Sequence, residues 1–366
     1  MHERIYVCHT FYHVYVACLK EFHIRREREA GGVAAGSATL VLSKMSNRFG
    51  SMVQRAEKSG IFEEVIEFDE KEDTFFPELK KLRKDTGNLA RNMCNRIRFC
   101  RRFPQLEEPY VPVDFRNYGD IYVFCDSDPI GYYLNYRKIR YHALEDGLNC
   151  IRYGDTARFD NSGHFRLKAF LASKGLIFIQ NGYARSCIDM EVNDISILPY
   201  PCPKYVEQPR EALTEELTRS EKDRLLQLFV ANLDELQAKL DSGRGMPRVL
   251  ILSEPLCDLA TRERIFRDLV TLYDTVNGHR AIVMIKQHPR DYLDYAAKFP
   301  DVILLDGTFP MEMLNFIPGL CFDRLVSVYT VVDSLHFVKE KIFLGDDFMD
   351  RYEDSKIHRI NEQIRN

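Results

Sequence analysis

The stretch from Asp120 to Gly147, DIYVFCDSDPIGYYLNYRKIRYHALEDG, decides the fold. Two apolar runs rich in aromatic and β-branched residues, DIYVFCD and KIRYHALEDG, flank a helix-length segment, PIGYYLNY. Apolar runs of this kind are typical of strands that are buried on both faces of a parallel sheet. The stretch therefore predicts a β-α-β unit, in which a helix connects two parallel strands and covers the sheet.

The same rhythm extends toward both ends of the chain. Further strands are predicted in RIYVCHT (4–10), ATLVLSK, EEVIEFD, RVLILSEP, AIVMIKQHP, DVILLDG, DRLVSVYT and KEKIFLGD. A proline-rich segment interrupts the rhythm, with prolines at 199, 201, 203 and 209. At 366 residues the chain is too long for one typical core. We expect an N-terminal Rossmann-like domain over 1–200, a linker and helical segment over 201–245, a second α/β domain over 246–347 and a C-terminal helix over 348–366.

Composition excludes several classes of protein. A net charge of −4 argues against binding to nucleic acid through bulk charge. The ten cysteines are scattered and form no C-x-x-C pair, which suits free thiols in the cytoplasm. No apolar run approaches the length of a membrane span. His9, Thr10 and His13 interrupt the apolar N-terminus, so it is expected to hold a first strand and not a signal peptide.

Polar residues follow four of the predicted strands, at the edge where ligands of open α/β sheets bind. They are Glu145-Asp146-Gly147 after the last strand of the first domain, His288-Pro289 ending AIVMIKQHP, Pro310 and Glu312 beyond DVILLDG, and Ser327 and Thr330 ending DRLVSVYT. Each has a structural interpretation as a turn, a strand end, a helix start or a cap. Because all four motifs follow strands and occur in this order, the set indicates a ligand-binding site more specifically than any single motif does.

These motifs resemble those of the bacterial sialyltransferases, which carry a D/E-D/E-G motif, a His-Pro motif and a Ser/Thr motif. The start IYVCHTFYHVYVACL is most similar to glycosyltransferase family 52, the lipooligosaccharide sialyltransferases, and the polysialyltransferases resemble the chain more distantly. The resemblance implies the GT-B fold, in which two Rossmann-like α/β domains face each other across a cleft. It also implies CMP-sialic acid as donor and a lipooligosaccharide or capsule glycan as acceptor, while a hexosyl-transferring member or a non-catalytic glycan-assembly protein remains an alternative.

Transfer with inversion needs a general base that takes the proton of the attacking hydroxyl. We expect Glu145 in that role and Asp146 as the residue that orients, with the reverse assignment left open. The resemblance gives His288 the task of stabilising negative charge on the departing CMP phosphate.

The remaining motif residues are expected to bind the donor. They are Gly147, Pro289, Pro310, Glu312, Ser327 and Thr330. A hydroxyl of Ser327 or Thr330 is expected on the phosphate and Glu312 on the ribose hydroxyls. Val328 and Tyr329 separate the two hydroxyl residues, so which of them meets the phosphate stays open. Thr10, Tyr12 and His13 are secondary candidates for contact with the donor sugar or the acceptor, or they simply start a helix that Thr10 caps.

No cofactor or metal is expected, because CMP-sialic acid carries one phosphate and not a diphosphate. Asp126 and Asp128 superficially resemble the D-x-D motif of metal-dependent transferases. We favour a strand end there, followed by a helix that starts at Pro129.

The segment from Lys80 to Arg102 is strongly basic. Its charged residues are Lys80, Lys81, Arg83, Lys84, Arg91, Arg96, Arg98, Arg101 and Arg102, with Asp85 as the only acid. Such a run is most often a solvated helix. The alternative is peripheral contact with the inner membrane, in which the interleaved apolar residues Leu82, Leu89, Met93, Ile97, Phe99 and Phe103 touch the headgroups. A homodimer is a further expectation.

Overall fold

The structure is a computed structural model that describes residues 2–46, 48–124, 126, 128–146, 164–196, 198, 202–243 and 245–358. It divides into two units, Met1–Glu221 and Lys222–Asn366. The division falls inside the segment 201–245, where the sequence predicted the connection.

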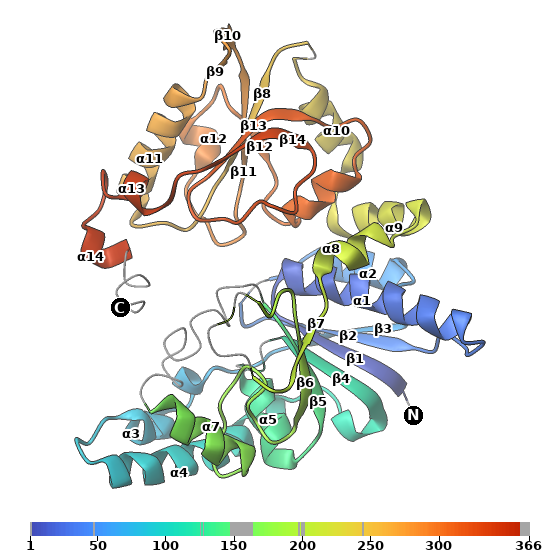
Figure 1. The fold of residues 1–366 in the computed structure, drawn as a ribbon, viewed down its shortest axis with the longest axis vertical. Coiled ribbons are helices and arrows are strands. Elements are labelled where there is room, and N and C mark those ends of the chain that lie inside the picture. The colour runs from blue at the N-terminus through green and yellow to red at the C-terminus, as the bar shows by residue number, and fades with distance from the viewer. Residues whose placement is uncertain are drawn as a thin grey trace. The chain divides into compact units, whose positions relative to one another are not determined.

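The first unit is built on a parallel sheet with the strand order β3-β2-β1-β4-β5-β6-β7 (Figure 1). Its strands are β1 (His2–Cys8), β2 (Ala38–Ser43), β3 (Glu64–Phe68), β4 (Tyr118–Phe124), β5 (Tyr141–Leu144), β6 (Cys187–Val192) and β7 (Tyr205–Glu207). Its α-helices are α1 (Phe11–Ala30), α2 (Met52–Lys58), α3 (Lys80–Arg83), α4 (Leu89–Glu107), α5 (Pro129–Arg137), α7 (Phe165–Ser173) and α8 (Arg210–Glu215). The described strand pairs are all parallel, which confirms the α/β class predicted from the β-α-β rhythm.

The binding edge of this sheet follows from its topology. β1 pairs with β2 on one side and with β4 on the other, so the chain switches direction across the sheet between β1 and β4. Ligands of open α/β sheets bind beyond the carboxyl ends of the strands at such a switch point. Residues just after β1, β4 and β5 therefore lie where a ligand is expected.

Apolar side chains fix this arrangement. On α5, Ile130 and Leu134 pack with Ile5 and Val7 of β1 and Val123 of β4 in one buried cluster. Because burying apolar area is the main favourable term in folding, these contacts hold the strand ends in register. The polar residues that follow the strands are positioned by that core.

Two strands of the first unit were missed from the sequence. β5 is not the last strand of the domain, because β6 and β7 extend the sheet beyond it. β6 has the sequence CIDMEV, in which Asp189 and Glu191 break the apolar run. β7 is a three-residue edge strand that lies close to prolines, where hydrogen bonding is needed on one side only.

The second unit contains a smaller parallel sheet with the order β12-β11-β8-β13-β14. Its strands are β8 (Arg248–Leu252), β11 (Ile282–Lys286), β12 (Ile303–Leu305), β13 (Phe322–Ser327) and β14 (Val338–Phe343), beside an antiparallel pair, β9 (Thr275–Val276) and β10 (His279–Arg280). Its helices include α10 (Leu233–Asp241), α11 (Leu259–Leu272) and α12 (Tyr295–Lys298), and α9 (Arg219–Phe229) crosses the division between the units. The switch point of this sheet lies between β8 and β13.

The C-terminal segment differs from the single helix expected over 348–366. Its described part forms two short helices, α13 (Gly345–Met349) and α14 (Ser355–His358). Phe348 and Met349 are buried with the apolar core of the second unit, so α13 belongs to that unit's fold.

Candidate active site

The loop after β1 fixes the orientation of His13. Thr10 caps α1, because its hydroxyl accepts the backbone N–H of His13 at 3.1 Å. The backbone N–H of His9 donates to Nδ1 of His13 at 3.1 Å. The His13 ring also stacks on Phe124, with centroids 4.0 Å apart and planes 2° apart. Since Nδ1 accepts a hydrogen bond, the neutral ring carries its proton on Nε2.

The Nε2–H of His13 is directed at Oδ1 of Asp146, which follows β5. His13 is buried, whereas the side chain of Asp146 is 34% exposed. A buried imidazole thus holds an accessible carboxylate in one orientation. Tyr12, the neighbouring candidate, is half-buried, and its ring lies against that of Tyr15 with centroids 6.3 Å apart.

Glu145 has a different environment from its neighbour Asp146. It is only 4% exposed, and its Oε2 accepts the backbone N–H of Asn193 at 2.6 Å. Its own backbone N–H donates to the carbonyl of Glu191 at 3.0 Å, so it joins the end of β5 to that of β6. Burial raises the pKa of Glu145, against the hydrogen bond from Asn193. Asp146 is therefore the more accessible of the two carboxylates. Gly147 lies outside the described residues.

His9 forms a second charged cluster beside His13. Its Nε2 lies 2.5 Å from Glu70 Oε2, and its Nδ1 lies 3.3 Å from Asp128 Oδ2. Glu70 also accepts the hydroxyl of Ser43 at 2.6 Å and the backbone N–H of Ile130 at 2.8 Å. Burial opposes the charge on His9, but the carboxylates of Asp128 and Glu70 outweigh it and raise the pKa of His9 to about 9. His9 is therefore an imidazolium that joins β1 to the start of α5.

Asp126, the first acid of the D-x-D-like sequence, has a structural role. Its carboxylate accepts the hydroxyl of Tyr141 at 2.6 Å and the backbone N–H of Asn181 at 2.5 Å. It is fully buried, and burial raises its pKa to about 7. Its φ of 41° marks a sharp turn between β4 and α5. Among the described residues, no group of three or more His, Cys, Asp or Glu side chains is arranged to hold a metal ion.

In the second unit, His288 follows β11 as the sequence predicted. Its backbone N–H donates to the hydroxyl of Ser253 at 3.0 Å, and its Nδ1 accepts the backbone N–H of Arg290 at 3.1 Å. The proton of the neutral ring is therefore on Nε2. Burial, with smaller effects from Arg290 and Lys286, lowers the pKa of His288 to about 4. His288 is a neutral hydrogen-bond donor at pH 7, and Pro289 after it is exposed.

The hydroxyl motif after β13 is anchored by Glu254, which the sequence did not single out. Oε1 of Glu254 accepts the backbone N–H groups of Val328, Tyr329 and Thr330 at 3.0, 3.0 and 3.1 Å. Ser327 is only 1% exposed, and its hydroxyl donates to the carbonyl of Thr330 at 2.9 Å. These contacts hold the loop at the β8/β13 switch point. In this structure the Ser327 hydroxyl and all three amides are engaged internally.

Two charged residues lie near the ends of β11 and β12: Lys286 is the last residue of β11, and Glu312 follows β12. Glu312 is on the 3₁₀ helix Met311–Phe316, which Pro310 precedes. Burial raises the pKa of Glu312, and the attraction of Lys286 opposes that rise. Lys286 is buried with its Nζ 4.1 Å from the centroid of the Phe309 ring, and burial lowers its pKa to about 7. Sequence reasoning missed Lys286, although a lysine that ends the apolar strand IVMIK was a usable signal.

The structure thus gathers the predicted residues into two sets. Thr10, His13, Glu145 and Asp146 are at the binding edge of the first unit. His288, Glu312 and Thr330 follow strands of the second unit, and Ser327 is the last residue of β13. His9, Glu254 and Lys286 are the main additions that the sequence did not predict as site residues.

Comparison with known proteins identifies the family and the fold of the chain. The sequence profile of glycosyltransferase family 52 matches residues 95–361. Similar solved structures include the α/β-galactoside α-2,3-sialyltransferase of Photobacterium phosphoreum, with 10% identity, a TM-score of 0.50 and coverage of 93% of this chain and 89% of that one. Another is the 2,6-sialyltransferase of Photobacterium sp. JT-ISH-224 in complex with CMP and lactose, with 9% identity, a TM-score of 0.55 and coverage of 99% and 76%. At these identities the likeness concerns the fold, and it confirms the GT-B type of α/β protein.

One curated relative is an uncharacterised protein of Haemophilus influenzae, 26% identical over 129 residues. The match spans 34% of this chain and 39% of that protein.

Proposed function

The chain belongs to glycosyltransferase family 52, and we propose that it is an inverting sialyltransferase that moves sialic acid from CMP-sialic acid to a sugar hydroxyl of a cell-surface glycan. The observation that carries this proposal is the contact of His13 with Asp146 at the β1/β4 switch point. It provides one accessible carboxylate of fixed orientation. The two sialyltransferases of similar fold support the choice of donor, since one of them was solved with CMP and lactose.

In this proposal Asp146 is the general base. The acceptor hydroxyl is a poor nucleophile and must lose its proton as it attacks the anomeric carbon. Asp146 reaches solvent and is oriented by His13, whereas Glu145 is buried and bound to Asn193. Glu145 then positions the loop after β5. This proposal reverses the roles expected from the sequence, in which Glu145 was the base and Asp146 the orienting residue.

His288 stabilises the leaving phosphate. Its Nε2–H donates to a phosphate oxygen, and the negative charge that develops there raises the pKa of the ring from its low value in the free protein. Glu312 accepts hydrogen bonds from the ribose hydroxyls, and Lys286 beside it supplies a donor for the nucleotide. Ser327, Thr330 and Glu254 shape the loop and contribute through its position.

The proposed reaction uses no metal, because a single phosphate can be stabilised by His288 and neighbouring donors. The direct test supplies CMP-sialic acid or UDP-hexoses to the purified protein with lactose, with and without EDTA. Sialyl transfer that persists in EDTA supports the proposal. Transfer from a UDP-hexose alone would make the chain a hexosyltransferase of the same family, and activity that is lost in EDTA and restored by Mn²⁺ would contradict the metal-free reaction.

The structure corrects part of the membrane hypothesis for the basic segment from Lys80 to Arg102. Phe99 and Phe103 are buried, and Leu82, Met93 and Ile97 pack against the same core cluster, so these residues do not face a membrane. Arg96 also points inward, donating to the hydroxyl of Tyr132 at 3.1 Å and the carbonyl of Phe178 at 2.9 Å. Leu89, which is 72% exposed, is the exception.

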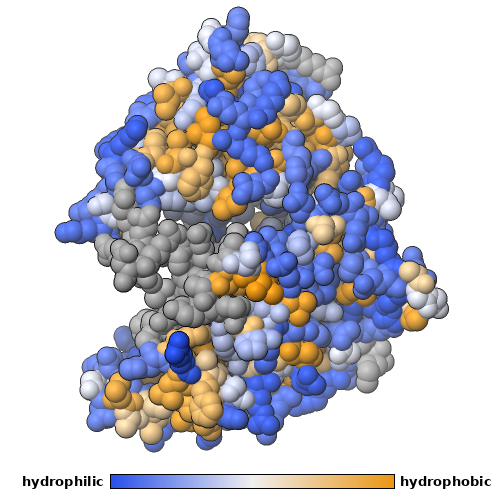
Figure 2. All heavy atoms as spheres, in the orientation of Figure 1, coloured by the Kyte–Doolittle hydropathy of each residue, from blue (hydrophilic) through white to orange (hydrophobic). Residues whose placement is uncertain are grey.

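We propose that the outer side of α4 rests on anionic lipid at the cytoplasmic face of the inner membrane, together with α7. Arg98, Arg101 and Arg102 are exposed on α4, and α7 exposes Leu167 and Phe170. Figure 2 shows apolar side chains gathered among hydrophilic ones at the end of the first unit where α4 and α7 lie. None of the helices in the described part of the chain combines the length and apolar character that a membrane crossing needs.

A further inference from the structure

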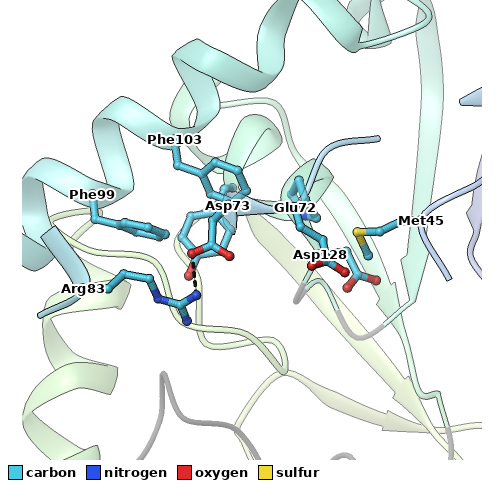
Figure 3. Close-up of a pocket in the computed structure, with 9 residues that line it drawn as sticks. Met45, Glu72, Asp73, Arg83, Phe99, Phe103 and Asp128 are labelled. Atoms are coloured by element: carbon cyan, nitrogen blue, oxygen red, sulfur yellow. Dashed lines mark hydrogen bonds and ion pairs between the residues drawn. The ribbon is translucent and has the colours of Figure 1, made fainter. Parts of the chain in front are cut away.

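A cavity of about 180 Å³ opens in the first unit beside the cluster of His9 (Figure 3). Its apolar side is formed by Phe99 and Phe103 of α4 and Tyr132 of α5. These rings pack edge to face, with centroids 5.3 Å apart for Phe103 and Tyr132 and 5.7 Å apart for Phe99 and Tyr132. They form a rigid apolar wall because all three side chains are buried in the core.

Carboxylates also line the cavity. Glu72, Asp73 and Asp128 line it, with Arg83 as the only cation among the lining residues that the structure describes. Arg83 forms an ion pair with Asp73 and lies over the ring of Phe99, so its charge is balanced within the cavity wall. Figure 3 shows this ion pair and the carboxylates of Glu72 and Asp128 around one opening. The cavity therefore has an excess of negative charge and hydrogen-bond acceptors.

The cavity is connected to the proposed base through a short series of contacts. Asp128 lies 3.3 Å from Nδ1 of His9, whose backbone N–H holds Nδ1 of His13, and His13 holds Asp146. A ligand in the cavity would therefore be linked to Asp146 through His9 and His13. The cavity is also smaller than the roughly 300–1,000 Å³ of pockets that take drug-sized ligands. It suits one sugar ring better than a nucleotide sugar.

From these features we infer that the cavity binds a neutral sugar unit of the acceptor and disfavours an anionic one. A sugar ring offers an apolar C–H face for the aromatic wall and hydroxyl donors for the carboxylates of Glu72 and Asp128. A sialylated sugar would bring a carboxylate next to those two carboxylates, and like charges at short range repel. The inference rests on the proposed function and narrows it, because it makes the enzyme prefer a neutral galactoside over a sialoside as acceptor.

Glu72 is the residue to change, because it is exposed and lies outside the proposed catalytic groups. Glu72→Gln keeps a hydrogen-bond acceptor and removes the charge, whereas Glu72→Lys removes both. Glu78 provides the matched control: it is also exposed, lies six residues away and pairs with Arg102 at 3.5 Å, but does not line the cavity. Circular dichroism would check that all four variants, at Glu72 and Glu78, keep the fold.

Binding of lactose and of sialyllactose is measured by saturation-transfer NMR on the protein without donor, and donor use is followed separately as CMP release. We expect the wild type to bind lactose more tightly than sialyllactose. Glu72→Gln should leave lactose binding nearly unchanged and strengthen sialyllactose binding, and Glu72→Lys should weaken lactose binding roughly tenfold, as expected for the loss of a hydrogen bond to a charged group. The Glu78 variants should behave as the wild type.

Equal binding of the two sugars, or equal effects of the Glu72 and Glu78 changes, would overturn the inference whatever the donor assay shows. A different result would be lactose binding that depends on Glu72 together with no release of CMP from CMP-sialic acid. That result would overturn the proposed donor but would still support the sugar site in the cavity. The two failures are therefore distinguishable.

Discussion

His13 and Asp146 are 133 residues apart in the chain, yet the imidazole of the first is hydrogen-bonded to the carboxylate of the second. The contact joins the helix after β1 to the end of β5, across the switch point of the sheet. Because a backbone N–H holds the other ring nitrogen, His13 can act toward Asp146 only as a donor in its neutral form. The pair therefore holds Asp146 in one orientation.

Replacing the two acids separately distinguishes their roles. Asp146→Asn should lower kcat by ~10²–10⁴-fold, the usual contribution of a general base, while the Kd for CMP stays the same. Glu145→Gln should have a much smaller effect on kcat, because a glutamine oxygen can still accept the N–H of Asn193. Steady-state kinetics with calorimetric CMP binding would measure both. The opposite order of effects would return the base to Glu145.

His288 should act on the donor alone. His288→Ala removes the Nε2–H donor and should lower kcat/KM for CMP-sialic acid, with little change in lactose binding. His288→Asn, which retains a donor, should recover part of the loss. Since burial lowers the pKa of His288 to about 4, activity of the wild type should not fall between pH 6 and pH 8 through deprotonation of this ring in the free enzyme. If kcat/KM of the wild type fell between pH 6 and pH 8, and kcat/KM of His288→Asn did not, His288 would be charged in the free enzyme and the proposal of a neutral ring would be wrong.

The charge on His9 should make the first unit lose stability at alkaline pH. Its folded pKa of about 9 is above the ordinary 6.5, so the stabilisation is complete below about pH 6.5 and is lost as pH rises through about 9. The difference in unfolding free energy between the wild type and His9→Gln should shrink by about 3 kcal/mol between pH 6 and pH 9.5. Urea unfolding followed by circular dichroism at the two pH values would measure it. A difference that does not depend on pH would mean that His9 is neutral.

Membrane contact should depend on the exposed arginines of α4. Combined replacement of Arg98, Arg101 and Arg102 by Glu should abolish salt-sensitive binding to vesicles that contain anionic lipid, since each basic group is worth about 1 kcal/mol there. The same triple reversal at Lys44, Arg55 and Lys58, on and near α2, is the matched control and should leave binding intact. Vesicle co-sedimentation measures both, and turnover of a soluble acceptor should not change. Equal binding by the two triple variants would remove the membrane role from α4.

The local chemistry of the strands made much of the fold predictable. Apolar runs such as IVMIK and RIYVC mark buried parallel strands. The Thr10 cap and the first-turn proline Pro129 mark the helices that follow β1 and β4. β6 was not predicted because acidic residues interrupt its apolar run, and β7 was not predicted because it has only three residues. Their pairing depends on neighbours that are distant in sequence, which no local pattern reports.

The sequence predicted the motifs of the candidate site but not the role of each residue within them. Glu145 and Asp146 are neighbours in sequence, but only the fold decides that one is buried against Asn193 and the other faces solvent. Glu254 likewise lies more than 70 residues from the amides that it binds, so the loop after β13 gave no sign of its internal partner. Long-range contacts of this kind become visible only once the strands are assembled.

The central claim is that this chain transfers sialic acid with inversion by means of Asp146. The most direct measurement is a ¹H NMR time course of CMP-sialic acid, which is a β-glycoside, with lactose and the purified wild type, repeated with Asp146→Asn. The proposal predicts that CMP and an α-linked sialyllactose appear together in the wild type and that both are nearly absent in the variant. A β-linked product, no sialyllactose at all, or an undiminished rate in Asp146→Asn would contradict it.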